Sequence, residues 1–244
     1  MKSPLLLSRV LLLAFSLLVT PTSAFSVSFG LGAVFFQPKG LVTTTSGGDP
    51  RKLLEASEFF VDAFWVGKVG GGAKELSERQ KQTLTNTQFK EFRGRYSGVQ
   101  RSQSELIVCE LPDGGEIIGC AGIEATPIPQ KNLKGPTGVR APLMSNLAVS
   151  RDFRRKGIAE KLVEKAERVA RYEWGYDDCY LYVEDRNRAA VRLYEKLGYR
   201  KVWVDRDAKT LLPCTNGNLQ NAPTTIVCMK KRLGGGMLGR LWPF

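Results

Sequence analysis

The chain contains no histidine among its 244 residues. Without imidazole it cannot build a Ser-His-Asp or Cys-His nucleophilic centre, and metal sites that need imidazole ligands are excluded. Cysteine is also scarce, and the few thiols form no CxxC pair, which argues against zinc and redox sites. We therefore expect no metal and no disulfide scaffold, but buried free thiols in a reducing compartment. The cysteines are Cys109, Cys120, Cys179, Cys214 and Cys228.

Acidic residues are fewer than basic ones, 24 against 36, which gives a formal net charge of +12. Such a balance favours an anionic partner: nucleic acid, a membrane surface or a phosphorylated cofactor. The basic residues are dispersed, with no zinc-finger spacing and no aromatic RNA-binding signature, so we expect no nucleic-acid partner. The hydrophobic share of 43% and the charged share of 25% are ordinary for a globular protein, and the length suits one domain with extensions.

A long hydrophobic run is found only at the N-terminus, over residues 5–19, and two serines and one arginine interrupt it. It is shorter than the roughly 20 residues that a membrane-spanning helix needs. Small residues at Thr22 and Ala24 suit a cleavage site before Phe25. The pattern predicts a signal peptide over residues 1–24, with a retained membrane anchor as the alternative.

The junction at Ala24 and Phe25 resembles the bipartite plastid-targeting presequences of algae with complex plastids. No acidic residue follows until Asp49, as in a transit peptide, so residues 25–48 are predicted to be a transit segment. The resemblance implies import into the plastid stroma and no membrane association after presequence removal; secretion is the rival destination. We expect a folded domain over residues 49–232 and a flexible, glycine-rich tail over residues 233–244.

The body reads as an alternation of helices and strands, which predicts an α/β fold with a mixed sheet. Glycines and prolines over residues 126–142 predict a loop, and polar residues with glycine and prolines over residues 205–223 predict another. The first expected helix begins at Asp49–Pro50. Three more are expected over residues 74–92, 155–174 and 187–197. The expected strands cover residues 104–111, 116–125, 143–149, 178–183, 199–204 and 224–230.

A strand over residues 143–149 runs into a helix through a basic, glycine-containing turn. Free amide groups at a helix N-terminus attract anions, and small residues let a phosphate approach the backbone. Gly157 and Ala159 supply the small positions of this turn, and Arg154, Arg155 and Lys156 supply positive charge. The turn suits a pyrophosphate, although by itself it could be no more than a basic helix start.

Two motifs in this region resemble those of the GNAT N-acetyltransferase superfamily. Residues 154–159 match its Gln/Arg-x-x-Gly-x-Gly/Ala motif, and residues 187–199 match its second signature, an Asn followed by Leu-Tyr and Leu-Gly-Tyr. The resemblance covers residues 105–230 and is closest to plastid enzymes that acetylate protein N-termini and lysines. It implies a mostly antiparallel mixed sheet with flanking helices and a splayed central parallel pair. It also implies acetyl-CoA as co-substrate and a protein or peptide amine as acceptor.

The resemblance assigns roles residue by residue. The backbone of residues 147–149 would hold the pantetheine arm, the amides of the following turn would wrap the pyrophosphate, and Asn187 would hydrogen-bond the cofactor. Tyr194, two helical turns after Asn187, would protonate the departing CoA thiolate. A purely structural alternative is that Asn187 caps its helix and Tyr194 packs. The expected cofactor-binding residues are Leu147, Ala148, Val149, Arg154, Arg155, Lys156, Gly157, Ile158, Ala159, Glu160, Asn187 and Tyr194.

The sequence departs from the family at one position, since Tyr182 stands where some members carry a glutamate that serves as general base. The base is therefore unassigned, with Glu124, Glu184 or a water held by Tyr182 as candidates. An α-amine, with a pKa of about 8, needs a base less than a lysine at about 10.4, which favours protein N-termini. An acetyltransferase for a small amine and a non-catalytic acetyl-CoA-binding module remain as alternatives.

Overall fold

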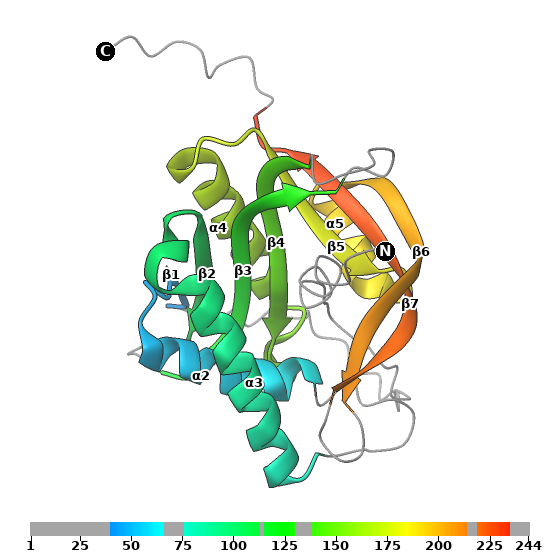
Figure 1. Ribbon diagram of the computed structural model, residues 1–244. Coiled ribbons are helices and arrows are strands. Elements are labelled where there is room, and N and C mark those ends of the chain that lie inside the picture. Colours follow the sequence, from blue (N-terminus) through cyan, green and yellow to red (C-terminus); the bar gives the residue numbers. More distant parts are fainter. Residues whose placement is uncertain (1–39, 66–75, 113–114, 130–137, 214–218, 235–244) are drawn as a thin grey trace, which may run out of the picture.

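The computed structural model describes residues 40–65, 76–112, 115–129, 138–213 and 219–234. Its strands form one sheet in the order β1-β2-β3-β4-β5-β7-β6 (Figure 1). Neighbouring strands are antiparallel except β4 and β5, which are parallel. The predicted mixed sheet with a central parallel pair is confirmed. The strands are β1 Val42–Thr45, β2 Ser104–Glu110, β3 Ile117–Ile128, β4 Val139–Val149, β5 Asp178–Glu184, β6 Arg200–Pro213 and β7 Leu219–Arg232.

The loops predicted over residues 126–142 and 205–223 are wrong at their ends, where β3, β4, β6 and β7 continue as long hairpin arms. The loops were predicted partly from their prolines, but two of these prolines lie within strands. Pro127 lies beyond the last β3 residue that pairs with β2, Glu124, so one edge of β3 is free there. Pro223 likewise precedes Ile226, the first β7 residue that pairs with β5. A missing amide donor is tolerated where a strand has no neighbour on that side.

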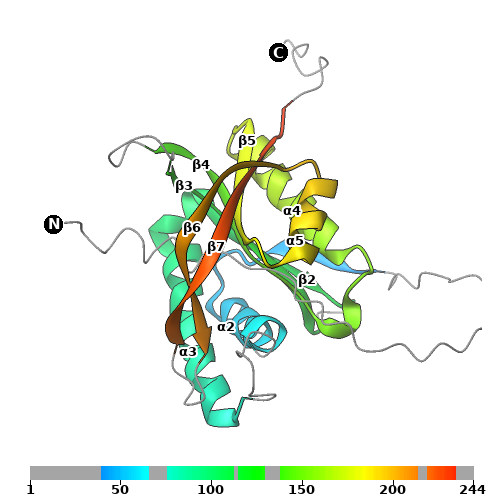
Figure 2. The ribbon, with the colours of Figure 1, turned by 90° about the vertical axis from the view of Figure 1, so that its right-hand side faces the viewer.

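Helices cover both faces of the sheet (Figure 2). One apolar cluster joins α2 and α3 to one face, and a second joins α4 and α5 to the other. The α-helices turn one stripe of buried side chains toward the sheet, such as Ile158, Leu162 and Ala166 of α4. The elements are α2 Pro50–Phe60, η1 Val61–Trp65, α3 Glu78–Tyr96, η2 Gly98–Gln103, η3 Arg151–Phe153, α4 Ile158–Arg168, η4 Val169–Glu173 and α5 Arg188–Lys196.

The sheet begins earlier than predicted, because β1 pairs with β2 from Val42 to Thr45. These residues fall inside the segment 25–48 that was expected to be a transit peptide, so the folded domain starts before Asp49. The predicted signal peptide and most of the predicted transit segment lie outside the described residues, as does nearly all of the predicted tail. Within the described residues, no helix has both the length and the apolar composition needed to cross a bilayer.

Candidate active site

Strands β4 and β5 part soon after they meet. Their parallel pairing is confined to Leu143↔Tyr180 and Met144↔Leu181, while β5 continues to pair with β7 as far as Glu184. Residues 145–149 of β4 therefore have a partner on only one side, β3. Backbone groups on the other edge are left for a ligand, because buried amides and carbonyls need hydrogen-bond partners.

A bulge in β4 lies at this point of separation. Between the pairs Gly122↔Ser145 and Cys120↔Ala148, β4 contributes one more residue than β3. Asn146 has a φ of 52°, in the left-handed region. A bulge of this kind kinks its strand and re-aims the side chains around it. The kink explains why β4 and β5 diverge after Met144.

Leu147 and Val149 turn their backbone toward the open edge of β4. The amide of Ser150 donates to the oxygen of Ile118 in β3 at 2.9 Å, so Ser150 faces β3. Because backbone groups alternate along a strand, those of Val149 and Leu147 face the opposite side. The side chains of both residues are buried against α4 and α5. The Val149 oxygen already accepts a hydrogen bond from Arg154 Nε, so the backbone role expected of these two residues stays a prediction.

The turn between β4 and α4 contains two left-handed residues, Arg155 with a φ of 63° and Gly157 with a φ of 78°. Gly157 is the N-cap of α4 and offers no side-chain cap, whereas Asp49, Ser77 and Asn187 cap α2, α3 and α5 with their side chains. Among the described α-helices, α4 thus presents amides that no capping side chain satisfies. Such amides, next to left-handed turn residues, make an anion-binding concavity.

Arg154, which was expected to bind the cofactor, makes two hydrogen bonds to the backbone. Its Nε donates to the backbone oxygen of Val149 at 3.1 Å, and its Nη2 donates to the oxygen of Ala63 at 3.3 Å. Burial, together with the nearby Arg151, lowers its pKa below the usual range for arginine. The side chain is half-buried and fastens the turn to β4 and η1. Arg155, by contrast, is exposed at the turn and free to meet a phosphate.

Asn187 and Tyr194 lie on α5, on the same side of the sheet as α4. The Oδ1 of Asn187 accepts from the amide of Ala190 at 3.1 Å, so this buried side chain caps α5, as the structural alternative proposed. Tyr194 is buried in the cluster that also contains Leu147, with its ring 5.8 Å from that of Tyr199. Burial, with a smaller contribution from Cys179, raises the pKa of Tyr194 well above 10, so its hydroxyl keeps its proton.

Three groups were candidates for the general base, and the surroundings of each one limit its ability to accept a proton. Glu124 accepts a hydrogen bond from Arg95 Nε and forms an ion pair with Arg95 Nη2, and Glu184 forms an ion pair with Arg186. The Tyr182 hydroxyl is buried with no hydrogen-bond partner among the described residues, on the face of β5 that looks toward α3. Burial raises the pKa of Tyr182 above its usual value, so this hydroxyl is neutral and cannot itself act as a base at neutral pH.

The described cysteines are free and buried. Burial raises the pKa of Cys179 and Cys228 to about 12 and also raises that of Cys120. A thiolate nucleophile is therefore disfavoured at these positions, because the thiolate and not the thiol attacks. Within the described residues no group of histidine, cysteine or acidic side chains could hold a metal ion.

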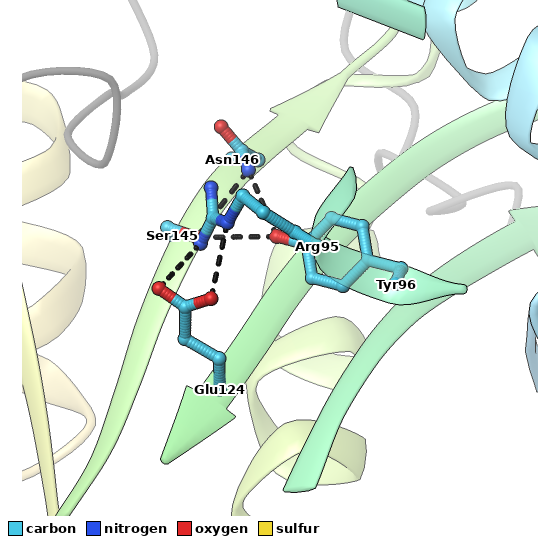
Figure 3. Close-up of polar contacts among 5 residues, drawn as sticks. All are labelled: Arg95, Tyr96, Glu124, Ser145 and Asn146. Atoms are coloured by element: carbon cyan, nitrogen blue, oxygen red, sulfur yellow. Dashed lines mark hydrogen bonds and ion pairs between the residues drawn. The ribbon is translucent and has the colours of Figure 1, made fainter. Parts of the chain in front are cut away.

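The sequence analysis missed a polar cluster beside the bulge, made by Arg95, Tyr96, Glu124, Ser145 and Asn146 (Figure 3). Its one sequence signal was the polar pair Ser145–Asn146 inside an otherwise apolar strand. The partners from α3 could not have been found, because nothing in the sequence of a solvated helix shows which of its side chains will reach a strand 50 residues away.

A separated parallel pair beside an uncapped helix N-terminus defines a fold and site suited to a long ligand with a diphosphate. Residues 73–199 match the model of the acetyltransferase (GNAT) family. The chain therefore belongs to the GNAT family. The resemblance stated from the two motifs is confirmed.

Individual proteins agree with this assignment. The chain is 38% identical over 88 residues to the GCN5-related N-acetyltransferase 4, chloroplastic, of Arabidopsis thaliana. This alignment covers 34% of this chain and 29% of the relative. It is also 38% identical over 69 residues to an N-alpha-acetyltransferase of Saccharolobus solfataricus, in an alignment that covers 28% of this chain and 41% of the relative. The alignments thus span less than half of either relative. Among solved structures, the acetyltransferase yncA of Salmonella typhimurium, determined with its cofactor acetyl-CoA, matches with a TM-score of 0.51 at 16% identity, covering 81% of this chain and 96% of the other.

Proposed function

We propose that this protein transfers the acetyl group of acetyl-CoA to N-terminal α-amines of proteins, with lysine ε-amines as a second class of acceptor. The observation that supports cofactor binding is the open edge of β4, residues 145–149, beside the uncapped amides of α4. The acceptor side is supported by the archaeal relatives named N-alpha-acetyltransferase and by Tyr182 at the position of the family's glutamate.

In this proposal the chain positions its ligands and moves one proton. The backbone of Leu147 and Val149 orients the pantetheine arm, and the amides after Arg154 hold the diphosphate. Acetyl-CoA supplies an activated acyl group, so no protein nucleophile is needed, in agreement with the raised pKa values of the buried thiols. Tyr194 keeps its proton at neutral pH and donates it to the leaving thiolate.

Both candidate carboxylates, Glu124 and Glu184, are held by arginines, which favours α-amines over lysines. Glu124 and Glu184 are engaged by Arg95 and Arg186, and Tyr182 is neutral. At a pH near 8, an α-amine with a pKa of about 8 is partly neutral, whereas a lysine side chain with a pKa of about 10.4 is almost wholly protonated. An amine that is already partly deprotonated in solution does not need a protein base to remove its proton. Tyr182 instead offers a hydrogen bond to the incoming amine or to a water beside it.

We further propose that the protein acts in the plastid stroma. The support is the presequence pattern of residues 1–39 together with the chloroplastic names of plant relatives. Stromal proteins keep their thiols reduced, which suits the free cysteines among the described residues.

The test is incubation of the protein with acetyl-CoA and a proteome-derived peptide library, with acetylated positions read by mass spectrometry. The proposal expects acetylation mainly at peptide α-amines and less at lysines. Exclusive acetylation of small amines added in parallel would support a small-molecule acetyltransferase. Binding of acetyl-CoA with no acetylated product would support a non-catalytic module and remove the role given to Tyr194.

A further inference from the structure

The polar cluster shown in Figure 3 connects helix α3 to the bulge of β4. Asn146 Nδ2 donates to the Tyr96 hydroxyl at 3.0 Å and to Ser145 Oγ at 3.3 Å. Arg95 Nη2 donates to the same Ser145 Oγ at 3.1 Å. Ser145, which precedes the bulge, and Asn146, which lies within it, are thus both fixed from one helix.

The cluster is complete and well buried. Arg95 makes two parallel contacts with Glu124, at 3.1 Å from Nε and 3.0 Å from Nη2, and both side chains are at most 20% exposed. Tyr96 is fully buried, and Ser145 and Asn146 are 4% and 3% exposed. A buried pair of charges is costly unless hydrogen bonds satisfy it, and here Ser145 and the bidentate geometry do so. A network this well satisfied holds its members rigidly.

Two backbone features depend on the cluster. A Cβ at Gly122 would lie 1.9 Å from the Tyr96 hydroxyl, so glycine at this position makes room for the tyrosine. Asn146 adopts a left-handed φ of 52°, which is unfavourable for most residues but tolerated by asparagine. Its side-chain hydrogen bonds to Tyr96 and Ser145 stabilise that conformation.

The cluster lies directly before the part of β4 that faces the separation from β5. Met144 is the last β4 residue that pairs with β5, and Leu147 is the first whose backbone faces the open edge. Ser145 and Asn146 stand between them. Any shift at Ser145 or Asn146 therefore moves the backbone groups of Leu147 and Val149.

We propose that Arg95, Tyr96 and Glu124 are positioning residues that act through Ser145 and Asn146: they set the open edge of β4 to which the pantetheine arm of the co-substrate hydrogen-bonds. The inference rests on the acetyl-CoA binding proposed above and not on the identity of the acceptor. It also assigns Glu124 a place in the architecture of the site. As a base, Glu124 would have to break both of its contacts with Arg95.

The test compares CoA with a CoA fragment that lacks the pantetheine arm, adenosine 3′-phosphate 5′-diphosphate. Calorimetry measures the affinity of each for the wild type and for Tyr96→Phe and Asn146→Ala. We expect CoA affinity to fall by about tenfold in each variant, since one or two hydrogen bonds are lost or misaligned. The affinity for the fragment should stay within about twofold, because the diphosphate site after Arg154 is untouched. Equal losses for both ligands, or no loss for either in folded variants, would overturn the proposal.

Three further variants separate positioning from simple destabilisation. Asn146→Gly should retain more CoA affinity than Asn146→Ala, because glycine adopts the left-handed conformation without strain. Arg93→Gln, at an exposed position on the same helix, is the matched control and should leave both affinities unchanged. Should either main variant fail to fold, Glu124→Gln preserves the side-chain shape while weakening the Arg95 contact.

Glu124→Gln also distinguishes the proposal from a role as general base. Positioning predicts a kcat lowered by a similar factor at every pH, with an unchanged shape of the pH profile. Loss of one limb of the profile would show that Glu124 exchanges protons with the acceptor and would refute the positioning role. The binding arms need no acceptor, so they remain decisive even if the wild type acetylates no peptide and the proposed acceptor class is wrong.

Discussion

Arg154 donates to the backbone oxygen of Val149 at 3.1 Å, so the first residue of the phosphate motif also fastens the strand that faces the co-substrate. A second hydrogen bond, to Ala63 at 3.3 Å, extends this connection to η1. The turn, the open edge of β4 and the helical segment beside α2 are therefore held together by one guanidinium.

Replacing Arg154 with methionine should destabilise the fold by about 1.5–3 kcal/mol, the usual worth of hydrogen bonds from a charged donor. Urea unfolding followed by circular dichroism measures the change. The matched control is Arg155→Met, because Arg155 is exposed and should leave stability within about 0.5 kcal/mol. Equal stability of the Arg154 variant and the wild type would show that these contacts do not hold the turn.

Gly157 tests the diphosphate site by charge alone. Both aspartate and asparagine tolerate its left-handed φ of 78°, and both can cap α4, so neither should unfold the chain. Only aspartate places a negative charge at the amides that should bind phosphate. We expect Gly157→Asp to weaken acetyl-CoA binding at least tenfold more than Gly157→Asn, as measured by calorimetry. Equal affinities of the two variants would contradict the placement of the diphosphate.

How much of this site the sequence could predict depended on how local each feature is. The turn after Val149 and the cap position of Asn187 were readable because a few consecutive residues determine them. The register of β4 was not, since the bulge at Asn146 depends on Tyr96 and Gly122, which come from other elements. Arg154 was assigned to phosphate from its charge, but its two carbonyl partners are supplied by folding.

The presequence can be tested apart from the enzyme. Residues 1–39 fused to a fluorescent protein should enter the plastid of an alga with complex plastids, observed by microscopy. Phe25→Ala in the same fusion should stop it in an outer compartment, because the transit segment is expected to begin with that residue. Secretion of the unmutated fusion would contradict the plastid address.

Buried tyrosines predict an alkaline limit to stability. Burial raises the pKa values of Tyr96, Tyr182, Tyr194 and Tyr199 in the folded protein, whereas in the unfolded chain they return to about 10. Below pH 10 the hydroxyls are neutral in both states, so stability is unaffected. Above it the unfolded state loses protons that the folded state keeps, and stability falls by up to about 1.4 kcal/mol per pH unit for each tyrosine. Urea unfolding from pH 8 to 11, with tyrosinate absorbance, measures this fall. A constant free energy of unfolding over that range would contradict it.

Tyr194→Phe removes only the hydroxyl that is expected to protonate the CoA thiolate. General acid catalysis is typically worth about 10² to 10⁴ in rate, so kcat should drop by a factor in that range. Acetyl-CoA affinity and folding should remain nearly unchanged, because the ring still packs against Tyr199.

The wild type should show no decline in kcat from loss of this proton below about pH 10, since burial raises the pKa of Tyr194. Tyr199→Phe, a buried neighbour with no assigned proton transfer, is the matched control and should keep most of its turnover. Wild-type turnover in Tyr194→Phe would mean that water or the amine proton serves the thiolate, and loss of acetyl-CoA binding would mean that the hydroxyl is structural.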